Sequence, residues 1–272
     1  MELSDRTGPS EIASKIENAG VAKTKIDVPT TFLLAVLAGA FISLGGIYFT
    51  FATAQQTISG PFTQVLGGLT FSLGLILVVV AGAELFTGNN LMVTALISKK
   101  IGLSSLLRNW AIVYVGNLVG AMLTSLVLYM SNVWSSNGYQ YGLRALSVAS
   151  IKVNHGFVEA FFLGILCNSL VCMAIWMASG GRRISEKVLA VIFPISAFVA
   201  IGFEHSVANM YFLSFALMIK GDSGLASAMP DISNLGLDGV IGNLVPVTLG
   251  NIVGGAVFVG AVYWFVYLRK KA

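Results

Sequence analysis

Two ionisable residues, Glu204 and His205, stand side by side within the largely apolar stretch "IGFEHSVANMYF" at 201–212. Carboxylates and imidazoles at membrane depth are rare, and they usually mark a substrate or proton pathway. Histidine is also the side chain that exchanges a proton near neutral pH. If the surrounding chain crosses a membrane, this pair predicts a functional site in which His205 shares or donates a proton.

The composition indicates that the chain does cross a membrane. Hydrophobic residues make up 56% of the 272 residues and charged residues only 10%, which is unlike a soluble domain. Stretches of roughly 20 apolar residues are long enough to cross a hydrocarbon layer about 30 Å thick. We therefore expect an all-α membrane protein with six transmembrane segments, at about 30–54, 62–98, 106–131, 155–179, 187–219 and 240–268.

The second and fifth of these segments are too long for one simple crossing, and each contains a polar interruption. They are therefore predicted to be broken helices. Lipid cannot satisfy the backbone groups that a break exposes, so such a break must be buried in protein or line a watery path. Helix ends at a break also favour anions, because their free N–H groups carry partial positive charge.

The positive charges predict the orientation of the chain in the membrane. Among the 16 Lys and Arg residues, only Arg144, Lys152 and Lys220 fall on the side opposite the termini. The positive-inside rule then places both termini in the cytoplasm. Because topology accounts for the net charge of +4, no nucleic-acid partner is expected.

Residues 1–29 are expected to form a cytoplasmic N-terminal segment, followed by a single transmembrane pore domain over 30–272. The segment lacks the pattern of a cleaved secretory signal. The stretch "EIASKIENAG" predicts a short amphipathic helix at the membrane surface, with Ser10 as its N-cap and Gly20 as its end.

An internal repeat relates the two broken segments. The stretch "GAELFTGN" at 82–89 matches "GFEHSVAN" at 202–209, and "GNLVGA" at 116–121 matches "GNIVGG" at 250–255. The chain is thus expected to contain two three-segment repeats, at about 30–131 and 155–268. Since three is an odd number of crossings, the second copy must enter from the opposite side, which gives inverted halves whose breaks meet near the midplane.

The repeat suggests roles for its polar residues. Glu84 and Glu204 occupy equivalent places, with Asn89 and Asn209 five positions later, and we expect the four to support the loops, with the carboxylates accepting backbone N–H groups. His205 breaks the symmetry because Leu85 stands at its counterpart. The alternative to a functional histidine is a buried ring satisfied by the hydroxyl of Thr87.

Several motifs together resemble the formate/nitrite transporter family, and most closely its formate channel branch. The resemblance covers nearly the whole chain. It is carried by "GFEHSVANM", "AGAELFTGN", "FSLGLIL" at 71–77, "GNLVGA", "KVNHGFVEA" at 152–160, "NLVPVTLGN" at 243–251 and the closing "YWFVYLR".

This resemblance implies an aquaporin-like fold, a homopentamer with one pore in each protomer, and the bacterial cytoplasmic (inner) membrane as location. It also implies roles for residues that match the family's motifs. Phe71, Leu75 and Phe198 match apolar constrictions, Leu85, Phe86 and Thr87 match the loop at the cytoplasmic mouth, Lys152 matches a position that attracts anions, and Asn168 matches a polar position of the pore.

The predicted function is a channel or transporter for small monovalent anions of weak acids, with formate as the first candidate. Moving a bare anion past Phe and Leu rings costs several kcal/mol or more, about what burying an unpaired charge costs. We expect His205 to share or donate a proton so that the species crosses as the neutral acid, or nearly so, while Thr87 and Asn168 provide hydrogen bonds. Electrostatic help without proton transfer is the alternative.

Other functions stay open from the sequence. Nitrite and hydrosulfide are small anions that the same family pattern could accommodate. A non-transporting membrane sensor would predict no flux. An enzyme is not expected, because the chain has no GxSxG or HExxH motif, and its two histidines and the spacing of Cys167 and Cys172 give no metal site. No cofactor is expected.

Overall fold

Six helices of the computed structural model are long and apolar enough to cross a membrane, within the described residues 7–54, 60–225 and 230–269. The prediction of six segments is confirmed. The crossings are α2 (Val28–Ala54), α3 (Pro61–Ala81), α6 (Leu103–Ser131), α8 (Phe157–Gly180), α9 (Ile184–Ile201) and the continuous run of α11 (Leu237–Ile252), the π-helical stretch η5 (Val253–Ala261) and α12 (Val262–Tyr267).

The second and fifth apolar stretches of the sequence are each interrupted. Helix α3 is followed by α4 (Phe86–Asn89), η2 (Asn90–Met92) and α5 (Val93–Ile97), and α9 is followed by α10 (Ser206–Ile219). Each interruption begins at a glycine in the left-handed region, Gly82 at φ 80° and Gly202 at φ 88°. Glycine ends a helix this way without the steric cost that a Cβ atom would add.

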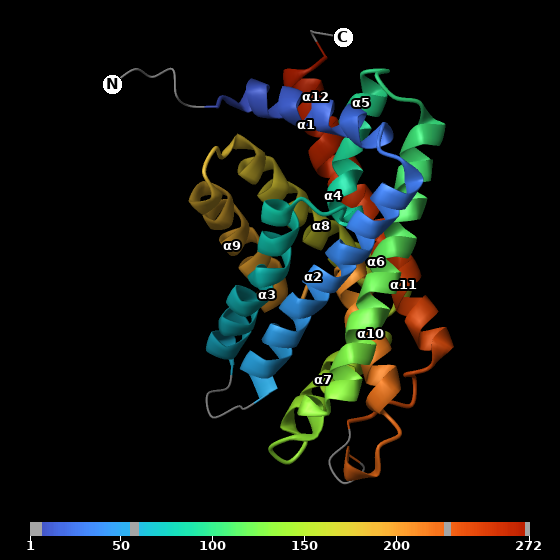
Figure 1. The fold of residues 1–272 in the computed structure, drawn as a ribbon. Helices are drawn as coiled ribbons and strands as arrows, with labels where there is room; N and C mark the ends of the chain where they lie inside the picture. The colour runs from blue at the N-terminus through green and yellow to red at the C-terminus, as the bar shows by residue number, and fades with distance from the viewer. Residues whose placement is uncertain (1–6, 55–59, 226–229, 270–272) are drawn as a thin grey trace.

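Helix α1 (Pro9–Thr24) lies across the end of the bundle where α5 and α12 are found (Figure 1). The expected bounds of this helix are wrong at both ends. Gly8 is its N-cap, and Pro9 takes the first helical position, which suits a residue without an N–H group. Gly20 lies inside the helix, where a Cβ atom would come within 3.3 Å of Cα of Met92. Gly20 therefore permits close packing and does not end the helix.

The opposite end of the bundle carries α7 (Gln140–Val153), which the sequence analysis left as a connection (Figure 1). The helix is too short and too polar for a membrane span, so a search for apolar stretches passes over it. It ends close to Lys152, and it therefore decides where that charge lies. Two single-turn elements, η3 (Val133–Ser135) and η4 (Ser223–Leu225), complete the described structure.

Candidate functional site

The backbone of each interruption is held by a neighbouring helix. The N–H of Glu84 donates to the carbonyl of Leu34 in α2 at 3.2 Å, and the N–H of Glu204 donates to the carbonyl of Leu163 in α8 at 3.4 Å. Both donors would otherwise be exposed at a break inside the bundle, where an unpaired N–H is costly. The two breaks thus receive equivalent backbone support.

Asn117 of α6 also holds the backbone of the first break. Its amide Nδ2 donates to the carbonyls of Ala35 and Glu84 at 2.8 and 2.9 Å. Its Oδ1 accepts the N–H of Phe86, the first residue of α4, at 2.9 Å. One buried amide therefore satisfies three backbone groups at the interruption.

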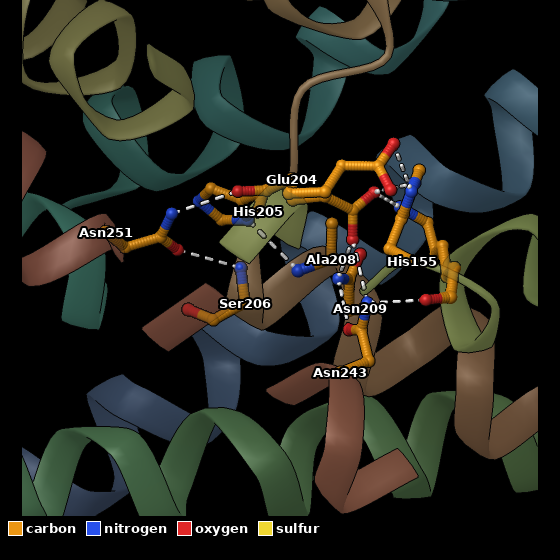
Figure 2. A network of polar contacts seen from close by, with 10 residues as sticks. His155, Glu204, His205, Ser206, Ala208, Asn209, Asn243 and Asn251 are labelled. Carbon is orange, nitrogen blue, oxygen red and sulfur yellow. Dashed lines mark hydrogen bonds and ion pairs between the residues drawn. The ribbon is translucent and has the colours of Figure 1, made fainter. Parts of the chain in front are cut away.

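Asn251 of α11 does the same at the second break (Figure 2). It donates to the carbonyls of Gly164 and Glu204 at 2.8 and 2.9 Å, and it accepts the N–H of Ser206 at 2.9 Å. The sequence analysis gave Asn251 and Asn117 no role, although both lie in the matched "GN" motifs. Their place in the repeat was the signal that could have identified them.

The carboxylate of Glu204 is 2% exposed and lies in a polar cluster (Figure 2). It accepts hydrogen bonds from Lys152 Nζ at 2.6 Å, from Asn209 Nδ2 at 2.6 Å and from Asn243 Nδ2 at 3.1 Å. His155 Nε2 lies 4.0 Å from the same oxygen that Lys152 contacts. Lys152 is therefore neutralised inside the protein, with only 12% of its side chain exposed.

The carboxylate of Glu84 has a similar set of partners. It forms an ion pair with Lys23 of α1 and accepts a hydrogen bond from Asn89 Nδ2 at 2.7 Å. Asn89 also donates to Asn109 Oδ1 at 2.8 Å, as Asn209 does to Asn243 Oδ1 at 2.7 Å. These partners differ from the expectation of backbone N–H groups: side chains hold both carboxylates, and neighbouring helices hold the loop backbones.

His205 is buried at the start of α10, where it acts as the N-cap. Its Nδ1 accepts the N–H of Ala208 at 3.0 Å, and its Nε2 lies 3.0 Å from the hydroxyl of Thr87. A ring nitrogen that accepts an N–H carries no proton, so the proton of the neutral ring sits on Nε2 and is donated to Thr87. The two breaks are thereby joined through a histidine and a threonine that the sequence analysis paired.

Aromatic rings lie against the imidazole. Phe198 of α9 stacks on His205 with 5.9 Å between ring centroids, and Phe71 of α3 meets Phe198 edge to face, also at 5.9 Å. Leu75, one turn after Phe71, is 2% exposed. The surroundings of His205 on this side are therefore largely apolar.

Two cavities lie beside the breaks. The first, which we call the His205 cavity, has a volume of about 80 Å³. The second, the Glu84 cavity, has about 230 Å³. The His205 cavity is lined by His205, Phe71, Phe198, Lys152, Asn209, Phe49, Val148, Val199, Phe203, Ala208 and Phe212. The Glu84 cavity is lined by Glu84, Leu85, Gly88, Asn89, Lys23, Val78, Val79, Gly82, Ala83 and Ile175.

The two linings correspond through the repeat. Lys152 faces the first cavity as the partner of Glu204, and Lys23 faces the second as the partner of Glu84. Leu85 lines the second cavity at the position that His205 takes in the first. Lys23 was not foreseen, because α1 lies outside both repeated units.

Asn168 of α8 bonds groups from three other elements. Its Nδ2 donates to the carbonyl of Thr87 at 3.2 Å, to Asn90 Oδ1 at 2.8 Å and to the carbonyl of Asn251 at 2.7 Å. The side chain is fully buried and lines neither of the two cavities. It therefore ties the first break to the sixth crossing.

Phe86 and Leu75 also line neither cavity. The ring of Phe86 packs edge to face on Tyr114 and Trp110 of α6, with centroid distances of 5.0 and 6.0 Å. Trp110 in turn donates to the carbonyl of Asn89 at 2.9 Å. These contacts anchor α4 to α6.

A family model described as formate/nitrite transporter matches residues 10–265. The chain belongs to this family. The formate channel FocA of Escherichia coli (strain K12) is 42% identical over 271 residues, with 97% of this chain and 95% of that protein covered. FocA of Haemophilus influenzae (strain ATCC 51907 / DSM 11121 / KW20 / Rd) is 38% identical, with 93% and 92% covered.

Solved structures of the family share the fold. A "pentameric formate channel with formate bound" superposes with a TM-score of 0.81 at 39% identity, covering 89% of this chain and 98% of that one. An "FNT family ion channel" gives a TM-score of 0.82 at 29% identity, covering 94% and 98%. The formate/nitrite transporter fold thus extends over nearly the whole of this membrane protein.

Proposed function

We propose that this protein is a channel for small monovalent anions of weak acids and that formate is its principal substrate. The observation that carries the proposal is the position of His205. The ring lines one cavity, adjoins the Phe71–Phe198 pair, and reaches Thr87, whose chain neighbour Gly88 lines the other cavity. Similarity to relatives named as formate channels, and to a pentameric channel with formate bound, supports the substrate.

The mechanism starts from the cost of desolvating the anion. A carboxylate that leaves water for the apolar ring pair loses its hydration. A hydrogen bond from the protein replaces part of the stabilisation that it loses. We infer that a substrate oxygen replaces the hydroxyl of Thr87 as the acceptor of the Nε2–H bond, while the bond from Ala208 to Nδ1 keeps the ring in place. The hydroxyl of Thr87 is then free to rotate and donate its own hydrogen to the same anion.

The hydrogen bond from Ala208 favours sharing of the proton over its complete transfer. A second proton on the ring would have to sit on Nδ1, where it would face the N–H of Ala208 and remove the N-cap of α10. A neutral imidazole that donates from Nε2 avoids this cost. The neutral ring thus holds the anion beside the apolar rings, where desolvation favours uptake of a proton from water, so the substrate crosses nearly as the neutral acid and its flux rises with acidity.

The remaining residues support this route. We assign the apolar constrictions to Phe71, Leu75 and Phe198, and the second mouth to Leu85 and Thr87, whereas Phe86 packs on α6 and holds this loop. Lys152 and Lys23 each present an ammonium group at their cavity as a hydrogen-bond donor to the anion, although the paired glutamate balances its charge. Glu84, Glu204, Asn89, Asn209 and Asn168 hold the breaks in place.

For the assembly, we propose a homopentamer in the bacterial cytoplasmic membrane with both termini in the cytoplasm. The pentameric relative and the distribution of Lys and Arg support this arrangement. Residues 1–29 form the cytoplasmic segment and 30–272 the pore domain, which carries the two repeats. The bilayer and the other protomers are then its partners, and its task is transport without catalysis.

A flux assay tests the proposal. The purified protein in liposomes is offered formate, nitrite and hydrosulfide at an acidic and at a neutral pH, with protein-free liposomes as the control for passive entry of the neutral acids. We expect formate to enter fastest and its protein-dependent flux to rise with acidity. Faster nitrite or hydrosulfide would contradict the substrate, and absence of any flux would favour a sensor.

A further inference from the structure

A third cavity lies at the α7 end of the bundle, next to the His205 cavity. Its volume is about 260 Å³, and we call it the Arg144 cavity. Phe49 and Val199 line both this cavity and the His205 cavity. The two spaces are therefore neighbours that share walls.

Helix α7 carries charge past both cavities. Arg144, Val148 and Lys152 are spaced four residues apart, so they lie on one face of the helix. Arg144 lines its own cavity, whereas Val148 and Lys152 line the His205 cavity. At a rise of about 1.5 Å per residue, the backbones of Arg144 and Lys152 are roughly 12 Å apart along the axis.

Two phenyl rings connect the cations. The guanidinium of Arg144 lies 5.6 Å from the ring centroid of Phe49, and Lys152 Nζ lies 5.6 Å from that of Phe212. The two rings meet edge to face at 5.7 Å. The surface between the two charges is thus apolar and continuous.

The charge of Arg144 differs from that of Lys152 in one respect. Lys152 is neutralised by Glu204, but within the described part of the chain no carboxylate pairs with Arg144. Its Nε donates to Thr53 Oγ1 at 2.9 Å, and no bond from its two Nη groups to a described residue is seen. The planar Nη pair matches the two oxygens of a carboxylate.

We propose that the Arg144 cavity is an entry site for the transported carboxylate at the α7 end of the pore. The anion binds the Nη groups side by side in the cavity that Gln64 also lines, and passes next to Lys152 in the His205 cavity. This inference rests on the proposed function. It adds a binding step that His205 and the constrictions do not require.

The test measures the concentration dependence of formate flux through Arg144→Gln in liposomes. Entry from the α7 end and from the opposite end are measured separately, with orientation read from protease cleavage of a tag added after Ala272. We expect the half-saturating concentration for entry at the α7 end to rise about 3- to 10-fold at low ionic strength, within the usual range of electrostatic guidance. Entry from the opposite end should keep its wild-type value.

Two variants serve as comparisons. Arg144→Lys keeps the charge without the planar fork, so its half-saturating concentration should fall between those of the wild type and Arg144→Gln. Arg269→Gln removes a matched charge at the other end, where the exposed Arg269 lies over the ring of Phe265 at 4.0 Å. It should leave entry at the α7 end unchanged. At about 1 M salt, where the Debye length is near 3 Å, the effect of Arg144→Gln should shrink.

Other results would overturn the entry site. If Arg144→Gln carries formate with a normal half-saturating concentration, the entry site is rejected and the proposed channel function is kept. If anionic lipid raises the midpoint of thermal unfolding of the wild type but not of Arg144→Gln, and half-saturation is again normal, the cavity binds a lipid phosphate. If the wild type carries nitrite instead, the same shift for nitrite keeps the entry site and rejects formate. No flux of any anion rejects both proposals.

Discussion

The two helix interruptions are built alike but differ in the residue that starts the second half-helix. Each has a left-handed glycine, a buried glutamate with a lysine partner, and an asparagine that holds the loop backbone. The first then has Leu85 and the second His205, each as the N-cap of the next helix. The duplicated parts support the break, whereas the residue suited to proton sharing occurs once.

The ion pairs offer the largest expected effect. Removing one partner of a buried pair typically costs about 3–5 kcal/mol, because the other charge stays buried without compensation. Glu204→Ala leaves Lys152 with 12% side-chain exposure, whereas Glu84→Ala leaves Lys23 with 26%. We therefore expect Glu204→Ala to lower the unfolding midpoint in detergent more than Glu84→Ala does. Equal losses would show that the difference in burial between the two lysines does not decide the energetic cost.

The second prediction makes the second break like the first. His205→Leu removes the donor to substrate while leaving the support of both glutamates in place. A hydrogen bond to a charged group contributes about 1.5–3 kcal/mol, so formate flux should fall by roughly 10- to 100-fold. Its pH dependence should also weaken, because the anion is no longer held where it takes up a proton, as measured in liposomes across an acidic and a neutral pH.

Thr87→Val is the matched variant for this test, because it removes the hydroxyl partner of Nε2 and keeps the imidazole. It should retain part of the flux and its pH dependence. If His205→Leu carried formate at the wild-type rate with an unchanged pH profile, the functional difference between the breaks would not lie at this residue.

The smallest effect is expected from the glycines, and it should be the same in both halves. Gly82→Ala and Gly202→Ala place a Cβ atom at φ 80° and 88°, where open space surrounds each. The left-handed conformation alone then costs roughly 1–2 kcal/mol. Thermal unfolding of the two variants should show similar losses. A clear difference between them would indicate that one loop is under strain that the other does not share.

The sequence alone could predict the six crossings, because apolar length is a direct consequence of bilayer thickness. The motifs also located the two interruptions and the family. Helix α7 was missed, because it does not cross the membrane and its run of apolar residues is short. The bounds of α1 were wrong because Gly20 was interpreted as a helix end, although its close packing against Met92 is a tertiary contact that no local pattern reveals.

The site was accessible where the repeat carried the information. Equivalent positions in the repeat identified Glu84 and Glu204, but not their lysines, which lie 61 and 52 residues earlier on helices outside both repeated units. Lys152 was named only through the family motif, and its pairing with Glu204 was not foreseen. The motif could not show where side chains point. The ring of Phe86 packs on α6, and the amide of Asn168 binds backbone and side-chain groups between helices.

The order of these partners along the chain has a consequence for biosynthesis. In both halves the lysine precedes its glutamate, so the ribosome has made Lys23 before Glu84 and Lys152 before Glu204. Asn117 and Asn251, which secure the loops, are made last in each half. Each acidic residue therefore enters the membrane when its counter-ion already exists, and the loop is locked only after the following helix arrives.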